Sequence, residues 1–244
     1  MRVLILGGTG EGRALAERLA GRPGVEVISS LAGRLARPVL PAGQVRIGGF
    51  GAEAGLRRYL MAEGIERVID ATHPFAARIT AGAVTACSAA GVPLLVLRRA
   101  GWVERPGDRW QRVGSVAAAA ALVAARPPGT VLLTVGRRDA AAFADDAAHR
   151  YVVRSVDPPA GPLPPRHVLV PARGPFTPDG ERALLRQHRV TVLVSRDSGG
   201  PATAAKLVAA GEAGVPVVLI DRPPLPGGAV TVATLDDALA WLGR

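Results

Sequence analysis

Short runs of apolar, β-branched residues alternate along the chain with longer alanine-rich stretches of helical length. This alternation is typical of parallel strands joined by crossover helices and predicts an α/β fold. In the first half it predicts strands at Val3–Leu6, Val25–Ile28, Val45–Ile47, Arg67–Ala71 and Pro93–Leu97, and helices near 11–21, 51–63, 76–90 and 115–125. In the second half it predicts strands at Thr130–Val135, Tyr151–Val156, His167–Val170, Val190–Ser195 and Pro216–Ile220, and helices near 139–148, 179–188, 201–213 and 235–243.

The 244 residues are enough for two lobes, and two features place a boundary between them. Arg126-Pro127-Pro128-Gly129 ends the preceding helix, because proline cannot continue it. The stretch AGVPLLVL at 90–97 resembles AGVPVVLI at 213–220, which indicates an internal duplication. We therefore predict two Rossmann-like, doubly wound parallel-sheet lobes, a dinucleotide-binding lobe at 1–127 and a substrate lobe at 128–244. Ligands are expected at the carboxyl ends of the strands, in a cleft between the lobes.

Charge points to an anionic partner. Thirty Lys plus Arg against twenty Asp plus Glu give a formal charge of +10, and Lys206 is the only lysine. An arginine-rich genome background explains part of this charge equally well. Aromatic residues make up only 4% of the chain and no basic run is interleaved with them, which argues against nucleic-acid binding.

Several other classes are excluded by what the chain lacks. Cys87 is the lone cysteine and the four histidines show no ligand spacing, so we expect neither disulfides nor a metal site. No apolar signal segment precedes Val3, and no run of about 18 apolar residues occurs, which predicts a cytoplasmic protein that does not span a membrane. Neither Tyr59 nor Tyr151 is followed by a lysine four residues later, which argues against a short-chain dehydrogenase. The first turn lacks Gly-Lys-Ser/Thr, which argues against a nucleotide-hydrolysing P-loop protein.

The strongest local signal is a buried strand, a glycine-rich turn and a helix start. Glycines allow the backbone to approach a pyrophosphate, and the helix offers unpaired N–H groups. With Gly8 and Gly10 as the first two glycines of the dinucleotide fingerprint, Arg13 falls where the third should be, so the match is partial. The predicted cofactor-binding residues of this turn are Gly7, Gly8, Thr9, Gly10, Glu11, Gly12 and Arg13.

The second and fourth strands add to this site. A cofactor with a free ribose 2′-hydroxyl usually meets an acidic residue after the second strand, where this chain has Ser29, Ser30 and Arg34. Hydroxyls and an arginine suit a 2′-phosphate, which favours NADPH over NADH. After the fourth strand, Thr72 is expected to hydrogen-bond the cofactor, and His73 can donate or accept a proton near neutrality.

The second half places basic and hydroxyl groups at its own strand ends. The turn Ser195-Arg196-Asp197-Ser198-Gly199 resembles an anion cradle, and Lys206 lies one helical turn beyond Thr203. The predicted substrate-binding residues are Arg137, Arg173, Ser195, Arg196, Ser198, Gly199 and Lys206.

Taken together, four segments resemble the precorrin-6A reductases of cobalamin biosynthesis. They are GGTGEGR at 7–13, SLAGR at 30–34, DATHPFA at 70–76 and SRDSGG at 195–200. The resemblance runs along nearly the whole chain, and the THPFA segment together with the GGTGEGR turn is its specific part. It implies two Rossmann-type lobes that can exchange a strand.

The resemblance also implies an activity, the reduction of precorrin-6A to precorrin-6B with NADPH, or with NADH in the cobalt-dependent branch. Many acetate and propionate carboxylates surround that macrocycle, which gives the arginines of the second lobe a purpose. The cofactor would deliver a hydride, with His73 and Asp197 as candidate proton donors beside solvent. An NADPH-binding sensor and a reductase of another polycarboxylate remain alternatives, and the oligomeric state is left open.

Overall fold

The computed structural model describes residues 1–33, 39–159 and 161–243. The chain forms two compact units, of which the first combines Met1–Ala100 with the residues from Pro223 onward and the second comprises Gly101–Arg222. We call them unit 1 and unit 2. Arg34 lies outside the described residues. No helix in the described ranges is long and apolar enough to cross a membrane.

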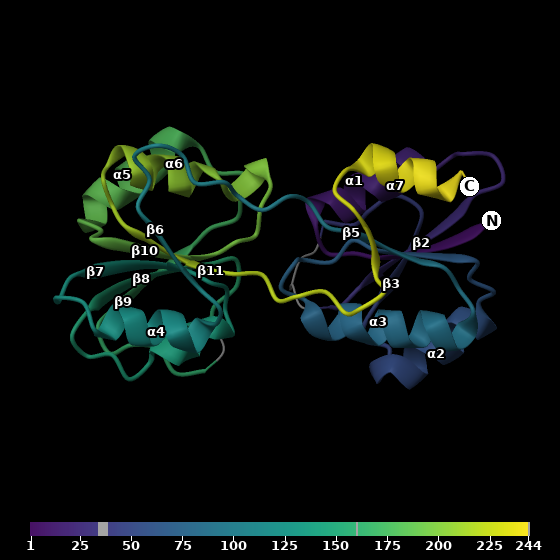
Figure 1. Ribbon diagram of the computed structural model, residues 1–244, viewed down its shortest axis with the longest axis horizontal. Helices are drawn as coiled ribbons and strands as arrows, with labels where there is room; N and C mark the ends of the chain where they lie inside the picture. Colours follow the sequence, from purple (N-terminus) through teal and green to yellow (C-terminus); the bar gives the residue numbers. More distant parts are fainter. Residues whose placement is uncertain (34–38, 160, 244) are drawn as a thin grey trace. The chain divides into compact units, whose positions relative to one another are not determined.

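Unit 1 is a six-stranded parallel sheet with helices on both faces (Figure 1). In spatial order its strands are β12 (Val230–Val232), β5 (Leu94–Leu97), β4 (Arg67–Asp70), β1 (Arg2–Leu6), β2 (Glu26–Leu31) and β3 (Gln44–Ile47). Alternate residues of β1 serve opposite faces, as a strand requires. Val3 and Ile5 pack in the core with α1 (Gly10–Leu19) and α7 (Leu235–Leu242), whereas Leu4 and Leu6 pack with α2 (Ala52–Ala62) and α3 (Ala77–Ala90).

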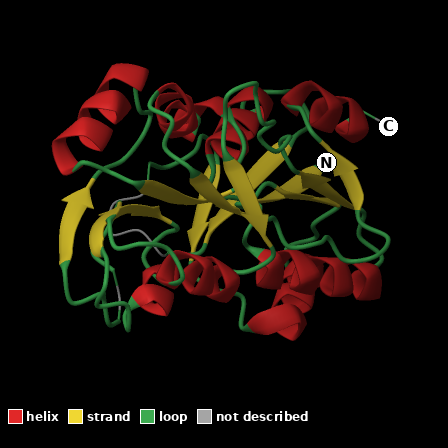
Figure 2. Cartoon of the chain, turned by 60° about the vertical axis from the view of Figure 1, so that its left-hand side comes forward, coloured by secondary structure: helices red, strands yellow, loops and turns green. Residues whose placement is uncertain are grey.

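Unit 2 repeats this architecture. Its parallel strands are, in spatial order, β6 (Trp110–Val113), β11 (Val217–Ile220), β10 (Val192–Arg196), β7 (Thr130–Thr134), β8 (Arg150–Ser155) and β9 (His167–Pro171). Helices α5 (Pro178–His188) and α6 (Ala205–Glu212) cover one face, and α4 (Val116–Ala124) covers the other (Figure 1). The short 3₁₀ helices η1 (Asp139–Phe143) and η2 (Pro201–Thr203) complete the unit. Figure 2 shows helices flanking the strands on both sides.

The two units exchange their last strand and helix. Both halves of the chain run through the same order of strands, but β6 pairs with β11 of the second half and β12 pairs with β5 of the first. The predicted boundary between residues 127 and 128 therefore matches the repeat and not the compact units. The segment containing β6 and α4 belongs to unit 2, and the segment containing β12 and α7 belongs to unit 1. The exchange implied by the family resemblance is thus present.

Two local expectations differ from the structure. The predicted helix at 139–148 is only the five-residue η1. Asp146 interrupts it, because its carboxylate accepts hydrogen bonds from the backbone N–H groups of Ala148 (2.8 Å) and His149 (3.2 Å) and from the Tyr151 hydroxyl (2.7 Å). The sequence analysis does not predict strands β6 and β12, because they are short outer strands of three or four residues with exposed positions.

Candidate functional site

The glycine-rich turn of unit 1 is held by Thr9 and Gly12. Thr9 is the N-cap of α1, and its hydroxyl accepts from the Gly12 N–H (3.1 Å) while donating to the carbonyl of Ala71 (2.7 Å). Ala71 directly follows β4, the neighbour of β1 in the sheet. The start of α1 is therefore fixed against two adjacent strand ends, at the point where the connections of the sheet run off in opposite directions.

The structure corrects the frame in which this turn matches the dinucleotide fingerprint. A Cβ added at Gly12 would lie 3.3 Å from the Ala71 Cβ and 3.4 Å from the Gly7 Cα, whereas a Cβ at Gly10 would meet nothing within 4 Å. Gly12 therefore permits close packing of helix on sheet, which is the role of the third glycine. Gly7 is then the first glycine, Thr9 replaces the second, and Arg13 is not part of the fingerprint. Gly8 is required by its φ of +112°.

Glu11 lies in the first turn of α1, where a bound phosphate would meet its negative charge. Its carboxylate is paired with Arg99, which lies just beyond β5, at a distance of 2.6 Å between Oε2 and Nη1. This ion pair neutralises an acid that would otherwise oppose an anion at the helix N-terminus. Arg13 lies partly exposed two residues further along the same helix.

The two serines of β2 lie inside the strand and not in the turn beyond it. Ser29 is 1% exposed, and its hydroxyl finds no hydrogen-bond partner in the described part of the chain. The Ser30 hydroxyl accepts from Arg46 Nη1 at 3.3 Å. Arg46 also donates to the carbonyls of Gly48 (2.6 Å) and Gly49 (2.7 Å), and stacks over Phe50 at 3.9 Å. Sequence reasoning missed Arg46, which was hidden among many arginines.

The turn after β4 is built around Asp70, which is 1% exposed. Its carboxylate accepts from the Thr72 backbone (2.9 Å) and hydroxyl (2.7 Å), and from the Thr80 hydroxyl (2.6 Å). His73 follows, and its Nδ1 accepts from the N–H of Phe75 at 3.2 Å. In the neutral ring this bond places the hydrogen on Nε2, so His73 can donate a hydrogen bond from that atom.

In unit 2 the corresponding point between two strand ends holds an arginine. Arg196 ends β10, and its Nη1 lies 3.1 Å from the Asp139 carboxylate at the start of η1. Gly136 lies above it, with a φ of +93°, and a Cβ there would come within 3.1 Å of Arg196 Nη2. Burial lowers the pKa of Arg196, and Asp139 opposes this shift. Arg137 lies between Gly136 and Asp139 and is partly exposed.

Asp197 is a structural centre of unit 2. It is 4% exposed, and its carboxylate accepts from the Trp102 N–H (3.0 Å) and from Arg112 Nη2 (3.3 Å). Arg222 donates from Nε to the Asp197 carbonyl (2.8 Å), and its Nη2 lies 3.7 Å from the carboxylate. Because these donors surround it, the geometry favours a structural role over proton donation for Asp197.

The rest of the SRDSGG turn is shaped by its backbone. Ser195 is 1% exposed, and its hydroxyl donates to the carbonyl of Arg196 at 3.2 Å, so it lies within the strand. The N–H of Ser198 donates to the same carbonyl at 2.7 Å. Gly199 and Gly200 both adopt positive φ, +64° and +76°, which explains the pair of glycines. Arg173 lies exposed after β9, and the neighbouring Phe176 donates its N–H to the carbonyl of Ala202, just beyond this turn, at 3.2 Å.

Lys206 is buried, at 4% exposure, in the first turn of α6. Its Nζ donates to the carbonyl of Thr203 at 2.8 Å and lies 4.6 Å from the centre of the Trp102 ring. Trp102 is in turn fixed by a hydrogen bond from Nε1 to the carbonyl of Gly200 at 3.0 Å. The sequence places Lys206 one helical turn beyond Thr203, whereas in the structure the two lie in different helices and Nζ bonds the Thr203 backbone; nothing in the sequence connects either residue with Trp102.

A buried ion pair lies close to Lys206. Arg154 of β8 donates from Nη1 to Glu181 of α5 at 2.6 Å, and both side chains are less than a tenth exposed. Burial is the main cause that lowers the pKa of Lys206 to about 7, with further lowering from Arg154 and Arg196 against an opposing effect of Glu181. The basic side chains of Lys206, Arg154 and Arg196 thus lie near one another in unit 2, and Glu181 is paired with Arg154.

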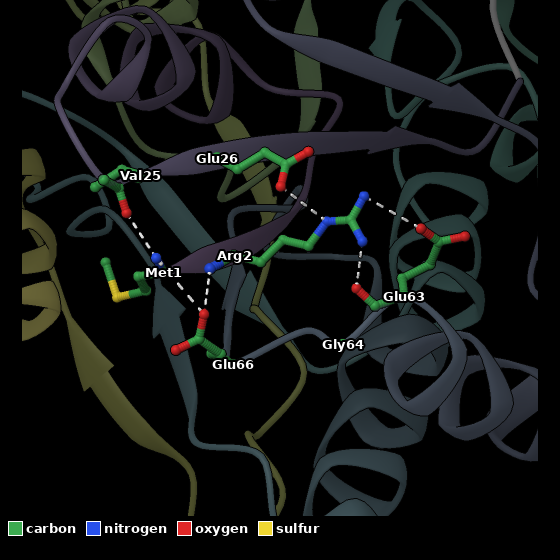
Figure 3. A pocket seen from close by; sticks show the side chains of 8 residues that line it. Met1, Arg2, Val25, Glu26, Glu63, Gly64 and Glu66 are labelled. Atoms are coloured by element: carbon green, nitrogen blue, oxygen red, sulfur yellow. Dashed lines mark hydrogen bonds and ion pairs between the residues drawn. The ribbon is translucent and has the colours of Figure 1, made fainter.

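A hollow of about 590 Å³ lies elsewhere in unit 1, at the amino ends of β1 and β2 (Figure 3). Its charged groups satisfy one another. Arg2 pairs with Glu26 (3.2 Å) and Glu63 (3.4 Å), and the amino group of Met1 lies 3.6 Å from Glu66. Ligands of open parallel sheets bind at the opposite, carboxyl ends, so we place the functional site there.

A doubly wound parallel sheet whose glycine-rich turn starts a helix at its switch point defines a dinucleotide-binding protein of the Rossmann type. The model of one family, described as precorrin-6x reductase CbiJ/CobK, matches residues 2–243. The chain belongs to this family of reductases.

Two curated proteins and one solved structure are similar to this chain over nearly its whole length. The precorrin-6A reductase of Rhodococcus erythropolis is 51% identical, over 99% of this chain and 97% of its own length. That of Rhodobacter capsulatus is 48% identical, over 99% and 95%. The solved structure named CobK precorrin-6A reductase superimposes with a TM-score of 0.92 at 47% identity and covers 100% of this chain and 96% of its own. Relatives named cobalt-precorrin-6A reductase are 28–30% identical.

Proposed function

We propose that this protein uses NADPH to reduce one double bond of precorrin-6A, giving precorrin-6B. The observation that supports the dinucleotide most directly is the close packing of Gly12 against Ala71 and Gly7, which brings the start of α1 to the switch point of unit 1. The proposed cofactor-binding residues are Gly7, Gly8, Thr9, Gly10, Gly12 and Thr72, and Ser30 and, from the sequence alone, Arg34 are candidates for binding the 2′-phosphate.

The metal-free macrocycle is the better substrate candidate. Relatives named for precorrin-6A are 44–51% identical to this chain, whereas those named for the cobalt form are 28–30% identical. The polycarboxylate character of the substrate suits unit 2, where Arg137, Arg196 and Lys206 lie at or near the strand ends.

Reduction of a double bond adds a hydride to one carbon and a proton to another. When bound, the cofactor supplies the hydride. The chain must orient both reactants and provide a path for the proton. We propose that His73 takes part in proton delivery: its Nδ1 accepts the Phe75 N–H, so the Nε2–H of the neutral ring can hydrogen-bond the substrate or orient a water molecule that supplies the proton. For Asp197 we propose a structural role, because Trp102, Arg112 and Arg222 surround its carboxylate.

The experiment is anaerobic absorbance spectroscopy of the purified protein with precorrin-6A and its cobalt form, each with NADPH or NADH. We expect NADPH-dependent bleaching of the macrocycle band, fastest with the metal-free substrate. Gly12→Val should weaken NADPH binding by at least about tenfold, because a side chain there must push α1 away from Ala71.

The matched control is Gly82→Val, since Gly82 lies in α3 of the same unit and a Cβ there meets nothing within 4 Å. Tight NADPH binding without reduction of either macrocycle would instead indicate a sensor or a reductase of another polycarboxylate. Equal NADPH binding by both variants would refute the dinucleotide site.

A further inference from the structure

The two units follow the same topology, so their strand ends can be compared position by position. In unit 1, Leu6 of β1 is in register with Asp70 of β4, and in unit 2 Thr134 of β7 is in register with Ser195 of β10. Two residues beyond Leu6 and Thr134 lie Gly8 and Gly136, which both have positive φ, +112° and +93°. The turns after β1 and β7 are therefore equivalent.

Equivalence of the turns makes one difference informative. The residue after Asp70 is Ala71, whereas the residue after Ser195 is Arg196. In unit 1 the small Ala71 lets Gly12 and α1 pack closely. In unit 2 the guanidinium of Arg196 reaches the turn above it, and the ten-residue α1 is replaced by the five-residue η1. Unit 2 thus lacks the long helix whose N-terminus would bind a pyrophosphate.

The charges around Arg196 are unbalanced. Its guanidinium is paired with Asp139, and Lys206 and Arg154 lie near enough for mutual repulsion to lower the pKa of Lys206. Glu181 is the second carboxylate, and it is paired with Arg154. Among the described residues, three basic groups thus lie near two acids, and this favours the uptake of a further negative charge when Lys206 is protonated.

The Arg196–Asp139 pair is accessible as well as charged. The two side chains are 24% and 32% exposed, so an incoming anion can reach both. A guanidinium binds a carboxylate through parallel N–H donors, and a carboxylate of a ligand is chemically equivalent to that of Asp139. The displaced Asp139 carboxylate, which is already 32% exposed, can turn to solvent, so that a ligand carboxylate takes its place at the guanidinium.

We propose that Arg196 is a carboxylate-binding residue of unit 2, and that Asp139 occupies its guanidinium until a substrate carboxylate displaces it. The identity of that carboxylate as one borne by the macrocycle rests on the proposed function. Asp139 is then an internal competitor, which keeps the arginine oriented and lowers the affinity for ligands with too few carboxylates.

The test compares Asp139→Asn with Asp145→Asn. Asp145 is exposed on the same connection, so both variants remove one negative charge, but only the first removes the competitor. Binding of precorrin-6A without cofactor is followed by its absorbance, and binding of propane-1,2,3-tricarboxylate by calorimetry. Asp139→Asn should tighten both by up to about fivefold, the strength of a partly exposed ion pair. Asp145→Asn should change them by less than about twofold.

Arg196→Met should weaken both ligands by at least about tenfold, with NADPH affinity as the control for folding. If Arg196→Met does not fold, the comparison of Asp139→Asn with Asp145→Asn still tests the proposal. Weaker binding by Asp139→Asn, or equal effects of the two Asn variants, would overturn the proposal even where precorrin-6A is reduced normally. Tricarboxylate binding that responds as expected, without any precorrin-6A binding, would refute the proposed function and leave the carboxylate site standing.

Discussion

Replacement of Asp197 distinguishes a structural residue from a proton donor. Its buried carboxylate faces Arg112 and Arg222 and accepts the N–H of Trp102, which precedes β6. Loss of one partner from a buried ion pair costs about 3–5 kcal/mol. Since the Arg112 side chain is 42% exposed, we discount this and expect Asp197→Asn to lower the free energy of unfolding by about 2–3 kcal/mol.

Urea unfolding followed by tryptophan fluorescence measures this loss, because two of the three tryptophans, Trp102 and Trp110, lie in unit 2. The control is Asp221→Asn, which removes a more exposed carboxylate (43%) from the same Arg112 and should cost less than about 1 kcal/mol. The reasoning fails if Asp197→Asn leaves unfolding unchanged while it slows reduction and shifts the pH–rate profile, since that result identifies Asp197 as the proton donor.

Three further predictions concern buried or paired groups. The unfolded chain keeps the Lys206 proton to about pH 10.4, whereas the folded chain releases it near 7, so the free energy of unfolding should rise between these values by up to about 1.4 kcal/mol per pH unit. Urea unfolding of Lys206→Met should lack this rise, and parallel curves would contradict it. Ser29→Ala should change the free energy of unfolding by less than about 0.5 kcal/mol in thermal unfolding, because the hydroxyl has no hydrogen-bond partner in the described ranges. A loss of NADPH affinity in this variant would therefore indicate direct contact between Ser29 and the cofactor. Arg99→Ala should weaken NADPH several-fold in a fluorescence titration, about the strength of one ion pair, and Glu11→Gln in the same chain should restore it.

The strand runs could be predicted from the sequence because most strands of these sheets are buried on both faces. Val131, Leu132 and Leu133 are all fully buried, so β7 is a continuous apolar run. The outer strands β6 and β12 are not buried in this way and have no such signal. No local sequence pattern predicts the strand exchange, because the exchange depends on which sheet has an unpaired edge for β6 and for β12.

The sequence could indicate a residue of the candidate site where a backbone requirement fixes it, as at Gly8 with its positive φ. It was not predictable where a role depends on neighbours distant in the chain. Asp197 and Trp102 are 95 positions apart, and no local spacing connects them. A single sequence shows an acid in a glycine-rich turn equally well whether that acid faces a ligand or two arginines.

The single lysine shows how composition and structure explain each other. Arginine keeps its charge at every pH at which proteins are folded, so an arginine at position 206 would add a third permanent charge beside Arg154 and Arg196. Lysine can lose its proton when buried, and the lowered pKa of Lys206 indicates that it does so near neutrality. A genome bias toward arginine therefore leaves this lysine unexplained. The position favours a cation that can become neutral, and the reason is visible only when Glu181, Arg154 and Arg196 are seen around it.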